Sequence, residues 1–560
     1  MDRRKFLNNS VKACASTFLV EQFFTERYLY GQNAMMNAIA GSCSDNILVV
    51  VQLFGGNDGL NTFIPLDQYS TLQGVRSNVM IAESNLRFAT SVNNGNSTLG
   101  NRSTITSKYA DLAFHPAMEG MYNLFESEKM SMIMGCSYDN PDFSHFRATD
   151  IWMMGGDSNE FLLSGWIGRD LEAQYGSYGF PDPQQLLNNG YPDPLSVNMG
   201  SVSPLALNDT KGIAAGVSVT TINNDYPLLG GYGDLAPQSC AGDELTYLRK
   251  VAIDTDKYNA RIVSAAAKVS DSTYPKSTLY GNDNLSKDLR NVAKLIKGGM
   301  KTKVYTVYQG GFDTHTSQVG GNTYDGTHTS LLNSVSRAIS GFQDDIQKMG
   351  VADKVVGVVF TEFGRTVKSN GGKGTDHGLS TPVWLFGQAL KGGRYGTNPQ
   401  ILNPKTNKVE AHVPMQYDYR SVYYSLLKDW FCLSQSQLES VFGGPTKTAK
   451  YAAQYHDLFR AGSITANPED VYNAQRTDKL IDIQPNPLEQ SGIIPFNTKG
   501  GYVTLEIYNT EGLKVKTIME KQVVPGHHEV RFDKQDLKAG MYLLRMKNGE
   551  FSESKKVVIK

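Results

Sequence analysis

The sequence is poor in cysteine, in net charge and in long apolar runs, and each shortage excludes a class of protein. Its 560 residues include only five cysteines, and none of these has the C-x-x-C spacing of a thiolate zinc site. The formal net charge is -1, so the chain has no general basic field that would hold nucleic acid. No segment approaches the ~20 consecutive apolar residues that a transmembrane span requires. We therefore expect a globular protein that does not bind nucleic acid and has no transmembrane span.

The first forty residues have the features of an export signal. Arg3 and Arg4 precede a weakly apolar segment at residues 11–24, as in a twin-arginine signal, and Ala38-Ile39-Ala40 offers a small-residue cleavage site. Glu21 interrupts the apolar segment, so an amphipathic first helix is the alternative interpretation. A signal at residues 1–40 predicts export to an oxidising compartment, where the remaining cysteines could form one or two disulfide bonds of undetermined connectivity.

Short apolar runs rich in β-branched residues alternate with glycine turns and helical patterns over residues 41–465. Strands are predicted at residues 47–54, 130–136, 303–308 and 354–360. Between the last two, apolar residues recur at three- and four-residue spacing from Leu331 to Ile346, which predicts a helix that ends at Gly350. A strand, a helix and a strand in this order indicate a parallel sheet with crossover helices, so the predicted fold class is α/β.

The pattern changes after about Ala466, and a second domain is predicted there. Short alternating strands separated by turn residues replace the helical spacing, at residues 502–508, 528–532, 541–546 and 555–559. We expect a linker at residues 466–482 and a small antiparallel β-sandwich at residues 483–560.

Side chains that suit a metal follow the predicted strands. Ligands of open parallel sheets bind beyond the carboxyl ends of the strands, so these positions are the candidate site. The candidate metal ligands are Asp58, Asp313, His315, Glu362, Asp376 and His377. Their oxygen and nitrogen donors suit a divalent ion such as Zn, Mn, Ca or Mg. Each motif alone is more typical of a turn with a hydrogen-bonded side chain, but their convergence on one sheet edge predicts a metal cluster.

A candidate nucleophile follows the predicted strand at residues 130–136. Ser144 precedes a helical stretch and is placed as its N-cap, where the helix N-terminus stabilises an anion. His145 beside it and Arg365, which could complement an oxyanion, complete the catalytic candidates. The alternatives are an ordinary capping serine and a solvated surface arginine.

Five motifs together resemble one bacterial family. They are FGGNDGLNT (54–62), FSHF (143–146), GGFDTH (310–315), TEFGRT (361–366) and GTDHG (374–378). This set is similar to the family called domain of unknown function fifteen-oh-one, which is itself similar to the alkaline phosphatase and sulfatase superfamily. The resemblance implies an alkaline-phosphatase-like, mainly parallel sheet flanked by helices, with a nucleophile beside one or two divalent ions.

The same resemblance implies roles by position. Ser144 matches the nucleophile, and one metal would be bound by Asp313, His315 and His377, with Asp376 as a substitute ligand. The second metal would have only Asp58, Glu362 and Ser144, because Phe363 stands where the superfamily has histidine. The implied function is a metal-dependent hydrolase of phosphate or sulfate esters, with an anionic ester, glycan esters included, as substrate. The departure at Phe363 leaves open a non-catalytic surface or binding protein on a degenerate scaffold.

The C-terminal segment has a resemblance of its own. Gln484-Pro485-Asn486-Pro487, LEIYNTEGLKV (505–515) and DLKAGMYLLRM (536–546) look like the type IX secretion sorting domain of Bacteroidota. This resemblance implies that the type IX secretion machinery is a partner. It also implies export to the periplasm and then to the outer-membrane surface or the extracellular space.

Overall fold

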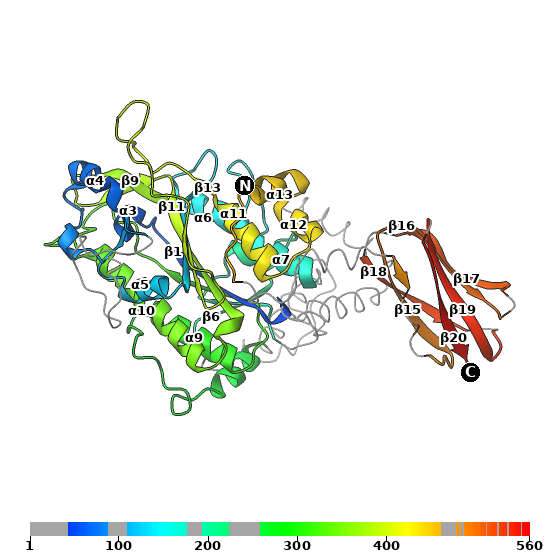
Figure 1. Cartoon of the computed structure of the whole chain (residues 1–560). Helices are drawn as coiled ribbons and strands as arrows, with labels where there is room; N and C mark the ends of the chain where they lie inside the picture. The colour runs from blue at the N-terminus through cyan, green and yellow to red at the C-terminus, as the bar shows by residue number, and fades with distance from the viewer. Residues whose placement is uncertain are drawn as a thin grey trace, which may run out of the picture. The chain divides into compact units, whose positions relative to one another are not determined.

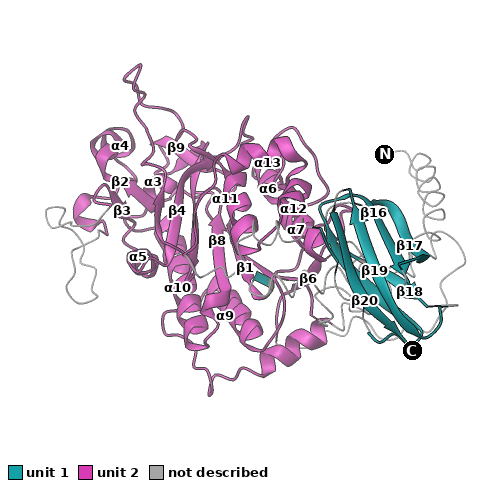
Figure 2. Cartoon of the chain, turned by 45° about the vertical axis from the view of Figure 1, so that its right-hand side comes forward, with its two compact units in different colours: residues 1–44, 465–560 teal, residues 45–464 magenta. Residues whose placement is uncertain are grey.

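The structure is a computed structural model that describes residues 43–87, 109–175, 193–222, 258–460 and 478–560, except positions 481, 482, 484, 485, 511, 524, 525, 535, 536 and 550 (Figure 1). The predicted export signal and most of the predicted linker lie outside these residues. The chain divides into two compact units (Figure 2). Asp45–Ile464 is called the larger unit below, and the described part of residues 465–560 is called the C-terminal unit.

The larger unit is built on a nine-stranded sheet with the strand order β12-β4-β11-β8-β1-β7-β5-β6, and β13 also pairs with β4. The strands are β1 (Ile47–Leu53), β4 (Met130–Ser137), β5 (Ser196–Met199), β6 (Gly216–Val219), β7 (Val304–Gln309), β8 (Val355–Phe360), β11 (Thr381–Gly387), β12 (Gly393–Tyr395) and β13 (Tyr417–Asp418). Among these strands all pairings are parallel except those of β11 with β4 and with β8. The predicted α/β fold with a mainly parallel sheet is confirmed.

Strand β1 lies inside the sheet between β8 and β7, and every one of its residues is buried. Val49 and Val51 pack into the core on one face, whereas Leu48 and Val50 pack into the core on the other. A strand covered on both faces favours this nearly continuous run of β-branched residues. The polar exception is Gln52, whose side chain faces the same way as Val50.

Helices cover both faces of the sheet. One core contains side chains of α5 (Glu119–Glu126), α9 (Asn284–Lys297) and α10 (Thr327–Lys348). The other contains side chains of α6 (His145–Met154), α7 (Trp166–Tyr175), α11 (Tyr419–Ser425) and α12 (Gln435–Phe442), with α13 (Pro445–Ala452) beside them. The predicted helix from Leu331 corresponds to α10, which begins four residues earlier at Thr327, and the chain leaves it through Gly350 in the left-handed region at φ 71°.

Short elements follow the carboxyl ends of β1 and β8. After β1 come α3 (Gly59–Thr62), β2 (Phe63–Pro65) and α4 (Tyr69–Arg76), and β2 pairs with β3 (Leu112–Phe114). After β8 comes the antiparallel pair β9 (Gly364–Ser369) and β10 (Thr375–Gly378). These elements carry the candidate site residues to the predicted edge of the sheet.

The C-terminal unit contains two antiparallel sheets. One is β14 (Lys479–Leu480), β15 (Ser491–Thr498) and β18 (Gly526–Asp533), and the other is β17 (Lys514–Val523), β16 (Gly501–Tyr508), β19 (Gly540–Asn548) and β20 (Phe551–Ile559). Phe496 and Phe532 of the first sheet share a core with Leu505 and Leu544 of the second. The predicted antiparallel sandwich is confirmed, although β15 and β17 were not among the predicted strands.

Two of the described cysteines, Cys43 and Cys432, are disulfide-bonded, and Cys136 is free and buried. Disulfide bonds are typical of proteins in oxidising compartments, and the predicted export to such a compartment would permit them. Within the described residues, no helix combines the length and apolar character needed to cross a membrane.

Candidate metal centre

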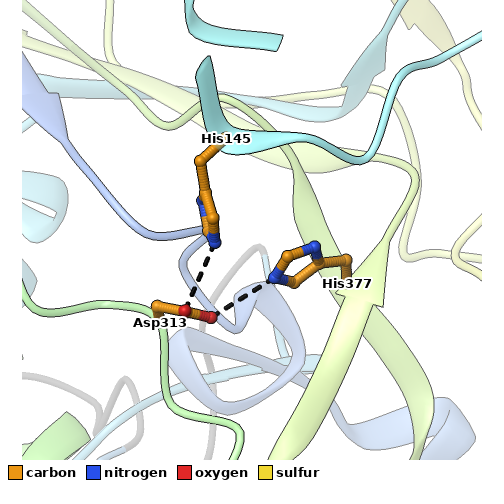
Figure 3. Close-up of side chains that lie close together, drawn as sticks. All are labelled: His145, Asp313 and His377. Atoms are coloured by element: carbon orange, nitrogen blue, oxygen red, sulfur yellow. Dashed lines mark hydrogen bonds and ion pairs between the residues drawn. The ribbon is translucent and has the colours of Figure 1, made fainter. Parts of the chain in front are cut away.

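Three side chains from separate elements meet beyond the carboxyl ends of the strands. His145 is the first residue of α6, Asp313 lies in the loop after β7, and His377 lies on β10 (Figure 3). Nε2 of His145 lies 3.3 Å from Oδ2 of Asp313, and Nε2 of His377 lies 3.3 Å from Oδ1. One ligand atom from each residue lies within 4.8 Å of the other two, a spacing that could hold a metal ion.

A third imidazole reaches the same carboxylate. Nε2 of His315 lies 3.1 Å from Oδ1 of Asp313 and 2.9 Å from Nε2 of His377. The predicted set of Asp313, His315 and His377 is therefore brought together, and His145 is added to it.

The second ring nitrogen of each histidine faces a hydrogen-bond acceptor. Nδ1 of His145 lies 2.7 Å from Oε1 of Glu362, Nδ1 of His315 lies 3.1 Å from Oδ1 of Asp376, and Nδ1 of His377 lies 2.8 Å from the carbonyl oxygen of Phe143. These acceptors assign the ring proton to Nδ1 and the lone pair to Nε2. Three lone pairs then face one carboxylate, an arrangement that a cation or added protons must compensate. Carboxylate or carbonyl partners on the far nitrogen are also the usual surroundings of metal-binding histidines.

The charges of the centre differ from residue to residue. Burial raises the pKa of the Asp313 carboxyl, but the hydrogen bond and charge of Arg365, with His377 and His145, lower it to about 2. The hydrogen bond to Glu362 raises the pKa of His145, whereas burial and the nearby Arg365 lower the pKa of His377. Asp313 is thus an anion at neutral pH, and His377 favours the neutral form that binds metal.

Arg365 holds the loops around Asp313 in place. Its side chain is fully buried, and its Nη2 lies 2.8 Å from Oδ1 of Asp313. The other donors go to backbone carbonyls, those of Gly55, Gly56, Phe312 and Thr375. The structure therefore does not present Arg365 to an oxyanion as the sequence predicted, because its guanidinium hydrogen bonds are directed into the protein. Its observed contacts are those of a positioning residue.

Gly55 allows the loop after β1 to lie against the loop that carries Asp313. Its φ is 121°, and a Cβ atom at this position would lie 2.2 Å from the backbone nitrogen of Asp313. A side chain here would thus strain the backbone and displace Asp313. The motif at residues 54–62 therefore supports the centre through Gly55, which lets the two loops pack closely.

Phe363 occupies the position at which a histidine is expected, and it packs against the centre. It is buried, and its ring centroid lies 4.9 Å from that of His145 and 4.5 Å from that of His377. Phe363 offers no ligand atom and instead provides an apolar wall beside both imidazole rings.

The three remaining predicted carboxylate ligands, Asp58, Glu362 and Asp376, do not join the group. Glu362 is fully buried and bonds His145 from behind, while Oε1 also accepts a hydrogen bond from the backbone nitrogen of Gly55 at 2.8 Å. Asp58 is buried in an ion pair with Arg76 and accepts a 2.6 Å hydrogen bond from Gln318. An arginine partner already satisfies the charge of Asp58, so the structure places it in support of the centre. Asp376 orients His315 and is likewise outside the group.

Ser144 lies at the N-cap position of α6, as predicted, and is exposed. Its side chain makes no capping hydrogen bond, and its backbone nitrogen instead donates to Oδ1 of Asp142 at 2.7 Å. Its hydroxyl is therefore not committed to the helix end. Its neighbour His145, predicted as a catalytic residue, was not predicted as a ligand, and only its place at the start of a helix near the sheet edge could have indicated that role.

Together these features define an α/β protein with a candidate metal centre at the carboxyl edge of its sheet. Residues 245–442 match the family described as "Protein of unknown function (DUF1501)", and residues 482–560 match the "Secretion system C-terminal sorting domain". Both family resemblances are confirmed. The second match indicates export through the type IX secretion system to the cell surface or the extracellular space. The first covers Asp313 and His377 but not His145.

No curated protein is significantly similar to the chain in sequence. Among solved structures, the chain is similar to a protein in the alkaline phosphatase superfamily from Vibrio parahaemolyticus, with a TM-score of 0.28 and 10% identity over 100% of this chain and 92% of that one. A similarity this low transfers no residue role, so the function is argued from the site itself.

Proposed function

We propose that the chain is an exported, metal-dependent hydrolase of phosphate or sulfate esters. The observation that carries the proposal is the convergence of imidazole Nε2 atoms on Asp313, with an acceptor behind each ring. Such a set is unfavourable unless a cation or added protons compensate it, and a metal cation does so by taking the lone pairs as ligands.

His145, Asp313 and His377 would hold the ion, and His315 lies within reach as a further donor. Two or three imidazoles with one carboxylate suit Zn or Mn better than Ca or Mg, which prefer oxygen donors. Three protein ligands leave a coordination position open, as catalytic sites require. When bound, the ion would supply Lewis-acid polarisation of the ester oxygen and charge for the transition state.

The position of Ser144 supports a nucleophilic role. Its exposed side chain directly precedes His145 at the N-terminus of a ten-residue helix, where negative charge on the attacking oxygen is stabilised. In this proposal Ser144 attacks phosphorus or sulfur, the alcohol leaves, and water then frees the serine. The centre is open to such a substrate because the side chain of Asp313 is 46% exposed.

The second candidate is a non-catalytic binding protein that keeps the metal centre. Two observations favour it: Phe363, which packs against the centre, offers no ligand atom, and Arg365 is directed into the protein. An anionic group could then bind the metal without being cleaved. Fold alone does not decide between the two functions.

The test uses the purified protein, stripped with chelator and reloaded with Zn or Mn. We expect one metal ion per chain by elemental analysis, and metal-dependent turnover in a panel of aryl phosphates, phosphodiesters and aryl sulfates. Asp313→Asn and His377→Ala should lose both metal and turnover, whereas Asp325→Asn, at an exposed loop position, should retain both. Metal binding without turnover across the panel would select the binding protein, and absence of metal binding would refute both candidates.

A further inference from the structure

A cavity of about 290 Å³ lies on the same face of the sheet as α6 and α7. Val50 and Gln52 of β1, Phe360 of β8, Met153 of α6 and Trp166 of α7 contribute to its wall. None of the described residues that line it is an acid, a lysine, an arginine or a histidine. An ionised group would lose its hydration there without a charged partner, so the cavity suits an uncharged ligand.

The cavity and the metal centre are built on the same strands. Phe54 lies two residues beyond Gln52, just past the end of β1, and Glu362 lies two residues beyond Phe360, the last residue of β8. The Phe54 ring centroid lies 5.6 Å from that of His145, and Glu362 bonds His145 directly. The adjacent strands β1 and β8 thus line the cavity, and the residues just beyond their carboxyl ends contact the same metal-ligand candidate.

The cavity also connects with apolar side chains on the surface. Tyr308 at the end of β7 is 58% exposed and Val202 is 79% exposed, and both belong to its lining. Exposed apolar side chains around a concave site are typical of a place where a ligand packs.

Gln52 supplies a polar contact within this mainly apolar wall. It is 9% exposed, and its Nε2 has no hydrogen-bond partner among the described residues. Asn198, another polar residue of the wall, is already paired with Val202, Ser218 and Thr306. A buried amide with unused hydrogen-bonding capacity is unfavourable until a ligand oxygen or water pairs with it.

We infer that this cavity binds the uncharged organic part of the substrate, an aryl group that carries an oxygen able to hydrogen-bond to the amide of Gln52. The aromatic and aliphatic wall supplies the contact area, Gln52 fixes the orientation, and the ester group reaches the metal centre. Its role as part of a substrate site rests on the proposed function. Binding of the aryl group alone does not require metal or turnover.

The experiment measures binding of 7-methoxy-4-methylcoumarin, an uncharged bicyclic aryl compound with a carbonyl oxygen, to the full-length protein by fluorescence titration. Gln52→Met keeps the length and removes the amide, so affinity should fall about 5-fold to 10-fold. Tyr308→Ala, at an exposed rim position with little effect on folding, should also weaken binding. The matched controls are Gln343→Met, another buried amide with no hydrogen-bond partner among the described residues, and Tyr502→Ala, an exposed tyrosine of the C-terminal unit. Both controls should bind as the wild type does.

A parallel assay compares 4-methylumbelliferyl and methyl esters of the same acid. Gln52→Met should raise KM for the aryl ester and leave KM for the methyl ester unchanged. The inference is overturned if the coumarin does not bind, or if Gln52→Met and Tyr308→Ala both bind it as tightly as the wild type. Coumarin binding that follows the prediction in a protein without ester turnover supports the binding site and refutes the proposed hydrolase. Turnover without coumarin binding would support the proposed hydrolase and refute the binding site.

Discussion

Nδ1 of His145 lies 2.7 Å from Oε1 of Glu362, although 217 residues separate them in the chain. Glu362 is itself fixed, because its two oxygens accept hydrogen bonds from the backbone nitrogen of Gly55 and from the hydroxyl of Thr361. The carboxylate therefore determines which way the His145 ring faces. It directs Nε2 toward Asp313 and strengthens it as a ligand.

Glu362→Gln should weaken metal binding about 10-fold to 100-fold, because a neutral amide orients the ring less firmly and makes Nε2 less basic. The measurement is a Zn competition titration with a chromophoric chelator at neutral pH. Glu119→Gln changes a glutamate whose side chain is 64% exposed and should leave the affinity unchanged. Equal affinities for Glu362→Gln and the wild type would show that the pair does not support a metal ligand.

Ser144→Ala should abolish ester turnover and leave metal content intact. Because the Ser144 side chain makes no capping bond, the change should cost less than the ~1 kcal/mol typical of a lost N-cap. Ser434 caps α12 through a bond from the backbone nitrogen of Gln437, so Ser434→Ala should cost about 1 kcal/mol without affecting turnover. Urea denaturation and aryl ester assays measure the two effects. Undiminished turnover in Ser144→Ala would refute the nucleophile assignment alone.

The sequence predicted the residues that follow the strands but not how their side chains are used. Asp313, His315 and His377 could be predicted because the ends of parallel strands meet at one edge, a rule that needs no tertiary detail. Asp58 and Arg365 have the same local signals, yet Asp58 is paired with Arg76, whereas Arg365 is paired with Asp313 and hydrogen-bonded to backbone carbonyls. Those partners depend on how separate loops pack, and no spacing within the chain encodes them.

His145 is the opposite case, a candidate metal ligand that the sequence did not predict as one. Its role depends on where α6 begins relative to β10, which the packing of α6 on the sheet determines. The reversed direction of β11 is a similar case, because the apolar run that forms it, Val383 to Phe386, is equally compatible with either direction.

Deletion of residues 483–560 should leave the larger unit folded and retain it in the periplasm. The two units have separate hydrophobic cores, and the removed segment is the one that matches the sorting domain. Cell fractionation with immunoblotting measures the location, and metal binding by the retained protein reports its folding. Surface delivery of the truncated chain at the wild-type level would contradict the assigned role of the C-terminal unit.

Asp170 on α7 predicts a pH-dependent stability that is independent of the metal centre. The residue is completely buried, and Oδ1 accepts a 2.8 Å hydrogen bond from Gln174 while Oδ2 has no partner among the described residues. Burial raises the pKa of its carboxyl to about 7. The folded state thus favours the protonated acid over the anion.

Because the folded pKa is raised, the stabilisation from Asp170 is complete below pH ~4 and is lost as the pH rises toward about 7. A shift of about 3 pKa units corresponds to at most ~4 kcal/mol. Asp170→Asn has nearly the same shape and cannot ionise, so it should match the wild type near pH 4.5 and melt at a higher temperature at pH 8. Thermal denaturation in chelator across this range tests the prediction, with Asp353→Asn as the exposed control. If the melting temperatures of Asp170→Asn and the wild type instead fall in parallel from pH 4.5 to pH 8, then Asp170 ionises normally. The loss of stability at high pH would then have another cause than this buried acid.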